Sequence, residues 1–343
     1  ADSFQQYGAN PGRGAYAMSL QSSALLWQTR NLLAAYFRAP DPQQIVFTNN
    51  TTQALNMILQ GFLQPGDHVL YSSFEHNAVW RPLMAMTDKG VLAEPFFPQA
   101  DGSIDWQDLE QKVRPQTKLL VCLQASNVSG AIFPIAELTA WAHAQGICIL
   151  VNAAQSAGYL PFSLLDIPVD FFAFPGHKGL YGPMGTGGFY VNPAQPLQPL
   201  LYGGTGSFSM QAEQPGVMPD HLESGTFNVP GIAGLHAALQ WRQGQEEAIL
   251  SHVQQLTQQF LKGVSQIPGI HCFGPAIDIP RAPVVSIVLE KITVAKAAML
   301  LEEKYQIAVR AGLHCAPLAH RSLGTLQTGT LRFSFGFFNT AAE

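Results

Sequence analysis

The chain has 343 residues, of which 47% are hydrophobic and 12% are charged, and its formal net charge is -5. This length and apolar content suffice for two globular domains. The mild acidity predicts no nucleic-acid partner. The sequence shows no apolar stretch of 18 or more residues and no signal peptide, so we expect no membrane association either.

The first two thirds of the sequence alternate helical patterns with short apolar strands. We expect helices over 22–37, 52–63 and 135–145, and strands over 45–49, 68–72, 118–124, 147–152 and 170–174. The strands are nearly continuous in apolar residues, which is typical of a parallel sheet covered on both faces. The pattern predicts a doubly wound α/β domain.

The last third of the sequence has a different pattern. After a glycine-rich stretch (176–206), a long helical pattern runs over 235–263. Shorter strand and helix patterns follow at 282–289, 295–304, 307–312 and 329–335. We therefore expect a large α/β domain over residues 1–240 and a small C-terminal α+β domain over residues 241–343. Active sites of such proteins lie at strand carboxyl ends and at domain junctions.

The cysteines are Cys122, Cys148, Cys272 and Cys315, which form no CxxC pair and no metal-ligand spacing, so we expect no metal site. Cys122 and Cys148 lie within apolar strand patterns and are interpreted as small buried hydrophobic residues. Cysteines used in this way fit a reducing compartment, so we expect a cytoplasmic protein.

One lysine, Lys178, follows the apolar strand pattern of 170–174 and precedes a glycine-rich turn. A lone lysine is more often a solvated surface residue. At a strand end beside glycines, however, the backbone can approach a ligand closely, and a lysine that forms a Schiff base needs such a confined setting. Thr51 and Thr52 lie between a strand and a helix, where amides and hydroxyls suit a phosphate. A plain threonine N-cap explains them equally well.

Several motifs succeed one another along the chain: FTNNTTQALN, FEHNAVWRP, SNVSG, VNAAQSAG, GHKGLYGPMGTG, ESGTFNVPGI, RAGLHCAPLAH and TLRFSFGFFNT. In this order they resemble the class V aminotransferase family of fold-type I pyridoxal 5'-phosphate (PLP) enzymes, in its group II cysteine desulfurase and selenocysteine lyase-like branch. The resemblance extends from Asn10 to Thr340. It implies a mostly parallel seven-stranded sheet between helices, PLP as cofactor, and a homodimer whose subunits share their active sites.

The resemblance assigns roles to individual residues. Lys178 would form the Schiff base and shuttle the Cα proton, and His76 would stack on the pyridine ring. The other cofactor contacts would come from Thr51, Thr52, Asn127, Asn152, Gln155 and His177, and from Thr226 across the subunit interface. Arg332 would bind the substrate carboxylate, a bidentate task that suits arginine, with His314 beside the substrate. Judged without the resemblance, His76 could be an ordinary loop histidine, and Asn127 and Gln155 could be turn and strand-end caps. Arg332 could be a surface arginine on an edge strand.

Cys315 decides the reaction that the resemblance implies. RAGLHCAPLAH matches the RxGxHCA loop of group II desulfurases, in which the cysteine thiolate takes sulfur from L-cysteine (or selenium from L-selenocysteine) and releases alanine. The persulfide would then pass to an acceptor protein. Since only the thiolate attacks, we expect the adjacent His314 to favour the anion. The alternatives are another PLP-dependent lyase or aminotransferase, which would not need Cys315, and a weakly active or inactive homologue.

Two residues depart from the family pattern. Asn152 stands where most relatives have an aspartate that pairs with the pyridine nitrogen, and a neutral amide supplies no charge there. Pro175 stands where serine or threonine is usual, which removes a hydroxyl and a backbone donor. Leu313 matches one sub-branch. The family's N-terminal segment is absent and its C-terminal helix is missing or short, so we expect a truncated chain.

Overall fold

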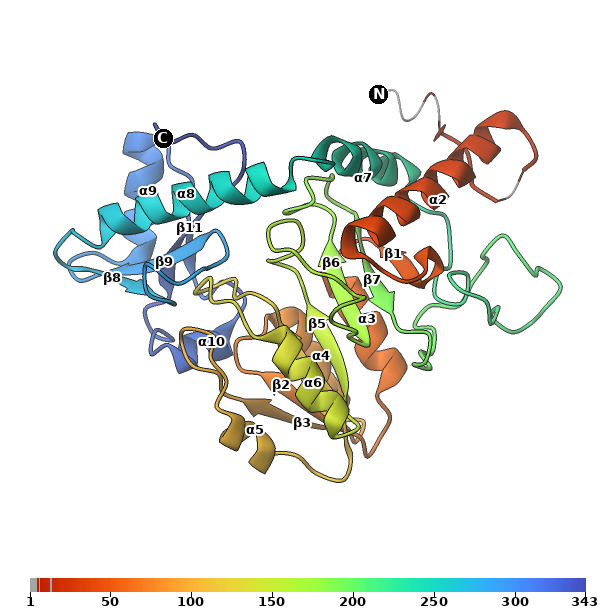
Figure 1. Ribbon diagram of the computed structural model, residues 1–343, viewed down its shortest axis with the longest axis horizontal. Coiled ribbons are helices and arrows are strands. Elements are labelled where there is room, and N and C mark those ends of the chain that lie inside the picture. Colours follow the sequence, from red (N-terminus) through yellow and green to blue (C-terminus); the bar gives the residue numbers. More distant parts are fainter. Residues whose placement is uncertain (1–4, 6, 13) are drawn as a thin grey trace.

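The structure, a computed structural model, describes residues 5, 7–12 and 14–343, and two sheets organise it (Figure 1). The larger sheet consists of β1 (Ile45–Thr48), β2 (His68–Ser72), β3 (Leu92–Phe96), β4 (Thr117–Leu123), β5 (Cys148–Asn152), β6 (Phe171–Pro175) and β7 (Gly187–Val191). Its seven strands have the order β1-β7-β6-β5-β4-β2-β3. Strands β2 to β6 are parallel, whereas β7 is antiparallel to both β6 and β1. The mostly parallel α/β architecture expected from the sequence is confirmed.

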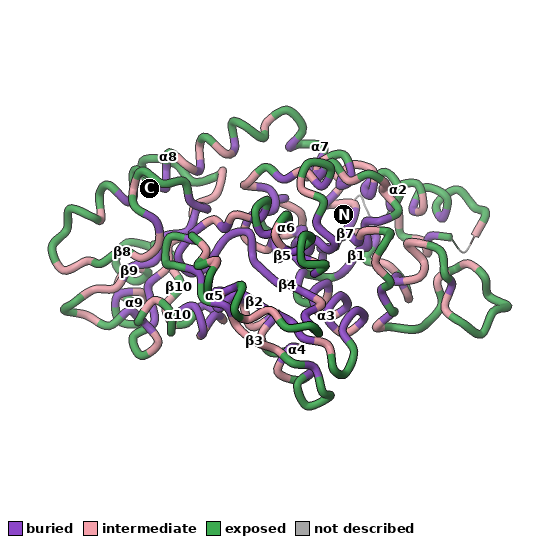
Figure 2. Tube along the Cα trace, turned by 60° about the horizontal axis from the view of Figure 1, so that its bottom comes forward, coloured by how far each residue is buried: buried purple, intermediate pink, exposed green. Residues whose placement is uncertain are grey.

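Helices cover both faces of this sheet. They are α2 (Ala17–Phe37), α3 (Thr51–Phe62), α4 (Asn77–Thr87), α5 (Trp106–Gln111), α6 (Ile135–Ala144) and α7 (Val229–Arg242), with the 3-10 turn η1 (Pro42–Gln44) before β1. Side chains alternate between the faces: Leu120 and Cys122 belong to the core shared with α2, α6 and α7, and Leu119 and Val121 to the core shared with α3 and α4. Except for the edge strand β3, whose residues are mostly half-buried or exposed, these strands are therefore buried almost throughout, as the purple colour in Figure 2 shows, and this explains their apolar sequences.

The second sheet has four antiparallel strands in the order β10-β11-β9-β8. These are β8 (Ile270–Phe273), β9 (Val284–Leu289), β10 (Arg310–Gly312) and β11 (Thr330–Ser334). With α8 (Glu246–Val264) and α9 (Val294–Tyr305) they form a core of their own. The short helix α10 (Pro317–Ser322) differs, because Ala316 and Ala319 pack into the core of the larger sheet. The segment after Cys315 thus contacts the larger unit.

The long helical pattern over 235–263 is two helices, so the expectation of one continuous helix was wrong. The chain leaves the helix at Gln243–Gln245, where Gly244 adopts a φ of 77°. A glycine in the left-handed region ends a helix at little steric cost. This break lies close to the domain boundary expected after residue 240, which stays a prediction. None of the described helices is both long and apolar enough to cross a membrane.

Candidate active site

A pocket of about 570 Å³ opens where the parallel strands β4, β5 and β6 end. Among the residues that line it are Thr51, Thr52, His76, Asn127, Asn152, Gln155, His177 and Lys178. Carboxyl ends of neighbouring parallel strands meet at one edge of a sheet, which brings together residues far apart in sequence. The structure therefore gathers these sequence-predicted residues around one cavity. Cys315, His314, Arg332 and Thr226 do not line it.

Lys178 lies on the pocket wall directly beyond β6. Its side chain is accessible through the open pocket, yet the desolvation imposed by the surrounding protein, with the charges of Arg332 and Arg310, lowers its pKa to about 8. A substantial fraction of neutral amine is then present near neutral pH, as a nucleophilic lysine requires. Beside it, His177 Nδ1 is buried and has no hydrogen-bond partner in the described part of the chain.

The first turn of α3 forms another part of the pocket wall. Asn50 is the N-cap and its side chain accepts a hydrogen bond from the Gln53 amide at 2.9 Å. The interpretation of Thr51 or Thr52 as the cap is therefore wrong. Their amides belong to the first helical turn, where N–H groups have no intrahelical partner and the helix dipole favours an anion. This end of the pocket suits a phosphate group.

His76 is the N-cap of α4. Its Nδ1 accepts a hydrogen bond from the Ala78 amide at 3.0 Å, which leaves the proton on Nε2. Burial, together with the charges of Lys178 and Arg310 among others, lowers the pKa of His76 to about 4. The imidazole is therefore neutral at physiological pH, and it faces the pocket as a flat, uncharged ring.

Asn152, the last residue of β5, carries a neutral amide into the pocket wall. Its Nδ2 donates a hydrogen bond to Glu75 Oε2 at 2.8 Å, and its Oδ1 accepts one from the Ala154 amide at 3.1 Å. Glu75 is fully buried, and burial raises its pKa to about 8 against the opposing effect of the Asn152 bond. The sequence analysis gave Glu75 no role. An acidic residue three positions beyond a buried strand was the signal available for it.

The Cys315 loop is held beside the pocket by two hydrogen bonds. The Asn77 amide donates to the Cys315 carbonyl at 2.7 Å, and Asn127 Nδ2 donates to the His314 carbonyl at 2.8 Å. His314 and Cys315 both have positive φ, 50° and 58°. This conformation is uncommon for residues other than glycine and persists only where surrounding contacts hold it. The two bonds therefore fix Cys315 relative to the pocket.

Arg310 supplies the positive charge beside Cys315. The Cys315 side chain is half-buried, and its Sγ lies 3.2 Å from Arg310 Nη2. Reactive cysteines occur in such electropositive, partly accessible settings. The expectation that His314 would favour the anion was wrong. Burial above all lowers the pKa of His314 to about 3, and its Nε2 hydrogen-bonds Thr330 Oγ1 at 2.8 Å, so its ring is neutral.

Arg332 lies opposite Arg310 in the β10–β11 register. Its Nη1 donates to the Asn127 carbonyl at 3.0 Å, and its Nε is buried without a partner. Burial and the neighbouring Arg310 lower the pKa of Arg332 to about 10. Neither arginine forms an ion pair with an acidic residue of the described chain. The pair therefore presents unneutralised positive charge next to the pocket, a setting for an anionic ligand.

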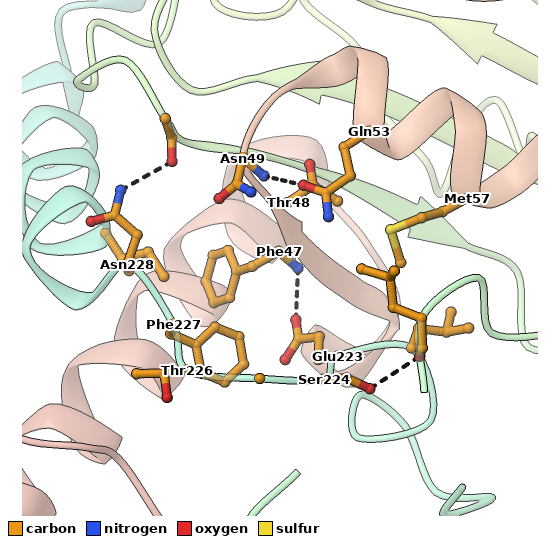
Figure 3. A pocket seen from close by; sticks show the side chains of 15 residues that line it. Phe47, Thr48, Asn49, Gln53, Met57, Glu223, Ser224, Thr226, Phe227 and Asn228 are labelled. Carbon is orange, nitrogen blue, oxygen red and sulfur yellow. Dashed lines mark hydrogen bonds between the residues drawn. The ribbon is translucent and has the colours of Figure 1, made fainter. Parts of the chain in front are cut away.

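Thr226 lies in a different place. It is exposed and lines a second pocket of about 600 Å³, between the 223–228 segment and the β1–α3 connection (Figure 3). There Glu223 accepts a hydrogen bond from the Phe47 amide at 2.6 Å and pairs with the buried Arg30. Within one chain, Thr226 is therefore not brought together with Lys178.

The described residues include no group of three or more His, Cys, Asp or Glu side chains suited to holding a metal ion. All four cysteines are free. Cys122 is buried, as predicted, whereas Cys148 is half-buried.

Comparisons with known proteins agree with this geometry. The family model described as aminotransferase class-V matches residues 1–343. A probable cysteine desulfurase of Methanothermobacter thermautotrophicus is 34% identical, over 99% of this chain and 86% of that protein. The apo cysteine desulfurase structure from Thermococcus onnurineus NA1 has a TM-score of 0.91 at 28% identity, covering 99% and 87% of the two chains. The cysteine desulfurase CsdA structure from Escherichia coli has a TM-score of 0.86 at 31% identity, with the same coverage. The chain therefore belongs to the class V aminotransferase family.

Proposed function

We propose that this protein is a PLP-dependent cysteine desulfurase that converts L-cysteine to L-alanine and keeps the sulfur as a persulfide on Cys315. One observation carries the proposal: the Cys315 loop is hydrogen-bonded to Asn127, which lines the pocket that holds Lys178, and to Asn77, whose neighbours His76 and Ala78 line it. A sulfur nucleophile and a confined lysine thus serve one site. The similarity to cysteine desulfurases over nearly the whole chain supports the same activity.

The pocket residues fit PLP. Asn127 Oδ1 and His177 Nδ1 are buried polar atoms without a partner among the described residues, and the α3 N-terminus has amides to spare for a phosphate. When bound, PLP supplies an electron sink for the carbanion formed at the substrate Cα. The phosphate would be held by Thr51, Thr52 and His177, and the ring by His76, Asn127, Asn152, Gln155 and a covalent bond to Lys178.

The remaining chemistry belongs to the side chains around the pocket. Arg332 would bind the substrate α-carboxylate, with its charge unpaired by any acidic residue of the described chain, and His314 would flank the substrate. The Lys178 amine would take the Cα proton and return a proton to the product. The Cys315 thiolate would attack the substrate sulfur. An S–S bond then forms as the Cβ–S bond breaks, so sulfur is oxidised to the persulfide level while Cβ is reduced to the methyl group of alanine.

We further propose a homodimer in which Thr226 of one subunit reaches the phosphate site of the other. Two features support this proposal: Thr226 lies away from Lys178 within one chain, and large apolar side chains are exposed nearby on α2 and the 201–217 segment. Examples of these are Leu20, Trp27 and Tyr202. The proposal also includes an acceptor protein for the persulfide and L-selenocysteine as a second substrate. It includes a cytoplasmic location, which the free cysteines favour.

The test is an absorbance spectrum of the protein with PLP, before and after L-cysteine, with alanine and sulfide assayed in parallel. We expect a visible band that is lost in Lys178→Ala, and alanine formation that is lost in Cys315→Ala while the band remains. A band that shifts with L-cysteine but gives no alanine would indicate another PLP reaction or a stalled site at Asn152. A protein that takes up no PLP would refute the cofactor assignment.

A further inference from the structure

Glu75 is a buried carboxyl group without a counter-charge. Its side chain is about 1% exposed, it forms no ion pair within the described chain, and its Oε1 has no hydrogen-bond partner there. Among the described residues, the only side chain that bonds it is Asn152, whose Nδ2 lies 2.8 Å from Oε2. Its titratable neighbours Cys122 and His76 are neutral near pH 7, because burial raises the pKa of Cys122 and lowers that of His76 to about 4. An isolated carboxylate in such a site is costly unless a positive charge is brought near it.

Asn152 connects this carboxyl group to the pocket, and its two hydrogen bonds define the orientation of its amide. Nδ2 donates to Glu75, and Oδ1 accepts from the Ala154 amide at 3.1 Å. The reversed amide would place two donors against each other at Ala154. Asn152 therefore offers the pocket an acceptor oxygen, whose second lone pair is available. An acceptor at this position favours a ring nitrogen that carries a proton.

We propose that Glu75 is the counter-charge for the pyridine nitrogen of PLP, and that it acts through the amide of Asn152 as a positioning residue. The inference rests on the proposed function. Asn152 occupies the place of the family's usual aspartate and brings no charge itself, whereas the Glu75–Asn152 pair supplies the carboxylate one residue further from the ring. A pyridinium bound in the pocket gives Glu75 a positively charged partner, which no described residue provides. It also shifts the proton from the carboxyl group toward the ring.

A competing arrangement contains the same number of protons. In it Glu75 keeps its proton and donates it to Asn152 Oδ1, and the reversed amide donates to a neutral ring nitrogen. The Ala154 N–H disfavours this state, since it would lose its acceptor. The two arrangements predict opposite protonation states of the ring, so the state of that nitrogen decides between them.

The test is nitrogen-15 NMR of the holoenzyme loaded with PLP labelled at the pyridine nitrogen. The wild-type signal is expected upfield, in the pyridinium range. Glu75→Gln keeps an acceptor for Asn152 but removes the charge, so its signal should move downfield to the neutral range. Asn152→Leu, nearly isosteric but without an amide, should move the signal the same way. The double variant Glu75→Gln/Asn152→Asp puts a carboxylate directly at the ring and should restore the upfield position.

Asp170→Asn is the control, since Asp170 is a buried acidic residue that accepts hydrogen bonds from Ile149 and Gln195, pairs with His143 and does not line the pocket. Its signal should stay at the wild-type position, because a general loss of stability does not change the ring. A neutral ring in the wild type, or a Glu75→Gln signal that stays upfield, overturns the inference while the proposed function stands. Absence of bound PLP in the wild type overturns both. If Glu75→Gln does not fold, Glu75→Met takes its place with the same expected downfield signal, and a signal that stays upfield overturns the inference.

Discussion

In the protein without cofactor, the Glu75→Gln substitution should increase stability at alkaline pH and not at acidic pH. Burial raises the Glu75 pKa from 4.5 to about 8. Between these two values the folded protein keeps a proton that the unfolded chain has released. Stability therefore has its full value below pH 4.5, falls as the pH rises toward 8, and is level above that. Glutamine has no proton to lose and removes this decline.

The size of the effect follows from the two pKa values. A difference of about 3.5 units corresponds to about 5 kcal/mol of unfolding free energy, at about 1.4 kcal/mol per unit. The gap between Glu75→Gln and wild type should thus widen by roughly 3–5 kcal/mol from pH 4.5 to pH 9, a large share of the stability of a typical domain. Bound PLP should reduce this gain, because its ring nitrogen supplies the missing positive charge.

The assay is urea unfolding of both apo proteins at a series of pH values from 4.5 to 9, followed by tryptophan fluorescence and by circular dichroism. The Asp170→Asn variant serves as the control and should gain nothing at pH 9, since its hydrogen bonds to Ile149 and Gln195 are weakened at every pH. Stability profiles of wild type and Glu75→Gln that run parallel across this range would refute the reasoning.

Three other predictions concern the pocket and its supports. The rate of PLP capture by the apo protein should rise with pH through about 8 and then level, because the Lys178 pKa is lowered to about 8 and only the neutral amine attacks; stopped-flow absorbance measures this, and a flat profile would contradict it. Arg242→Met should lower the free energy of unfolding by about 2–4 kcal/mol in thermal unfolding, because Arg242 is fully buried and donates to the Gly158 and Gly179 carbonyls at 2.6 and 2.5 Å. As the control, Arg321→Met should change it little, because Arg321 is exposed. Asn127→Ala should remove the hydrogen bond to the His314 carbonyl, which is worth about 1 kcal/mol, and so speed amide hydrogen exchange over 313–316 by about fivefold. Mass spectrometry measures this exchange, and an unchanged rate would show that other contacts hold the loop.

Local sequence patterns pointed to Lys178 and Thr51, whereas the resemblance to the class V aminotransferase family assigned Asn127 and Asn152 to the pocket. Asn127, Asn152 and Lys178 lie at or beyond the ends of parallel strands, and parallel strands bring their carboxyl ends to one edge of the sheet, so the fold places all three at the pocket. The turn at Thr51, which we propose to bind the phosphate, was recognisable from the sequence as the junction of a strand and a helix. The break between α7 and α8 was missed because Gln243, Gln245 and Glu246 are good helix formers and a single glycine among them does not by itself end a helical pattern.

The contacts that set charge and protonation around Cys315 and Asn152 depend on the tertiary structure. Arg310 meets Cys315 because the loop between β10 and α10 folds back on itself, and Arg310 lies beside Arg332 because the antiparallel register pairs them. His314 is neutral because segments far away in the chain bury it. The contact of Glu75 with Asn152 joins the ends of two strands that are not neighbours in the sheet.

The sequence by itself therefore determined the α/β fold and the setting of Lys178 through apolar periodicity and strand ends, which depend on neighbours along the chain, and the other pocket residues through the motifs that resemble a known family. Only the tertiary structure decided which charged side chains lie beside Cys315 and Asn152. It also decided whether each titratable group is ionised. Burial and electrostatic energy depend on distances between segments that the sequence places far apart.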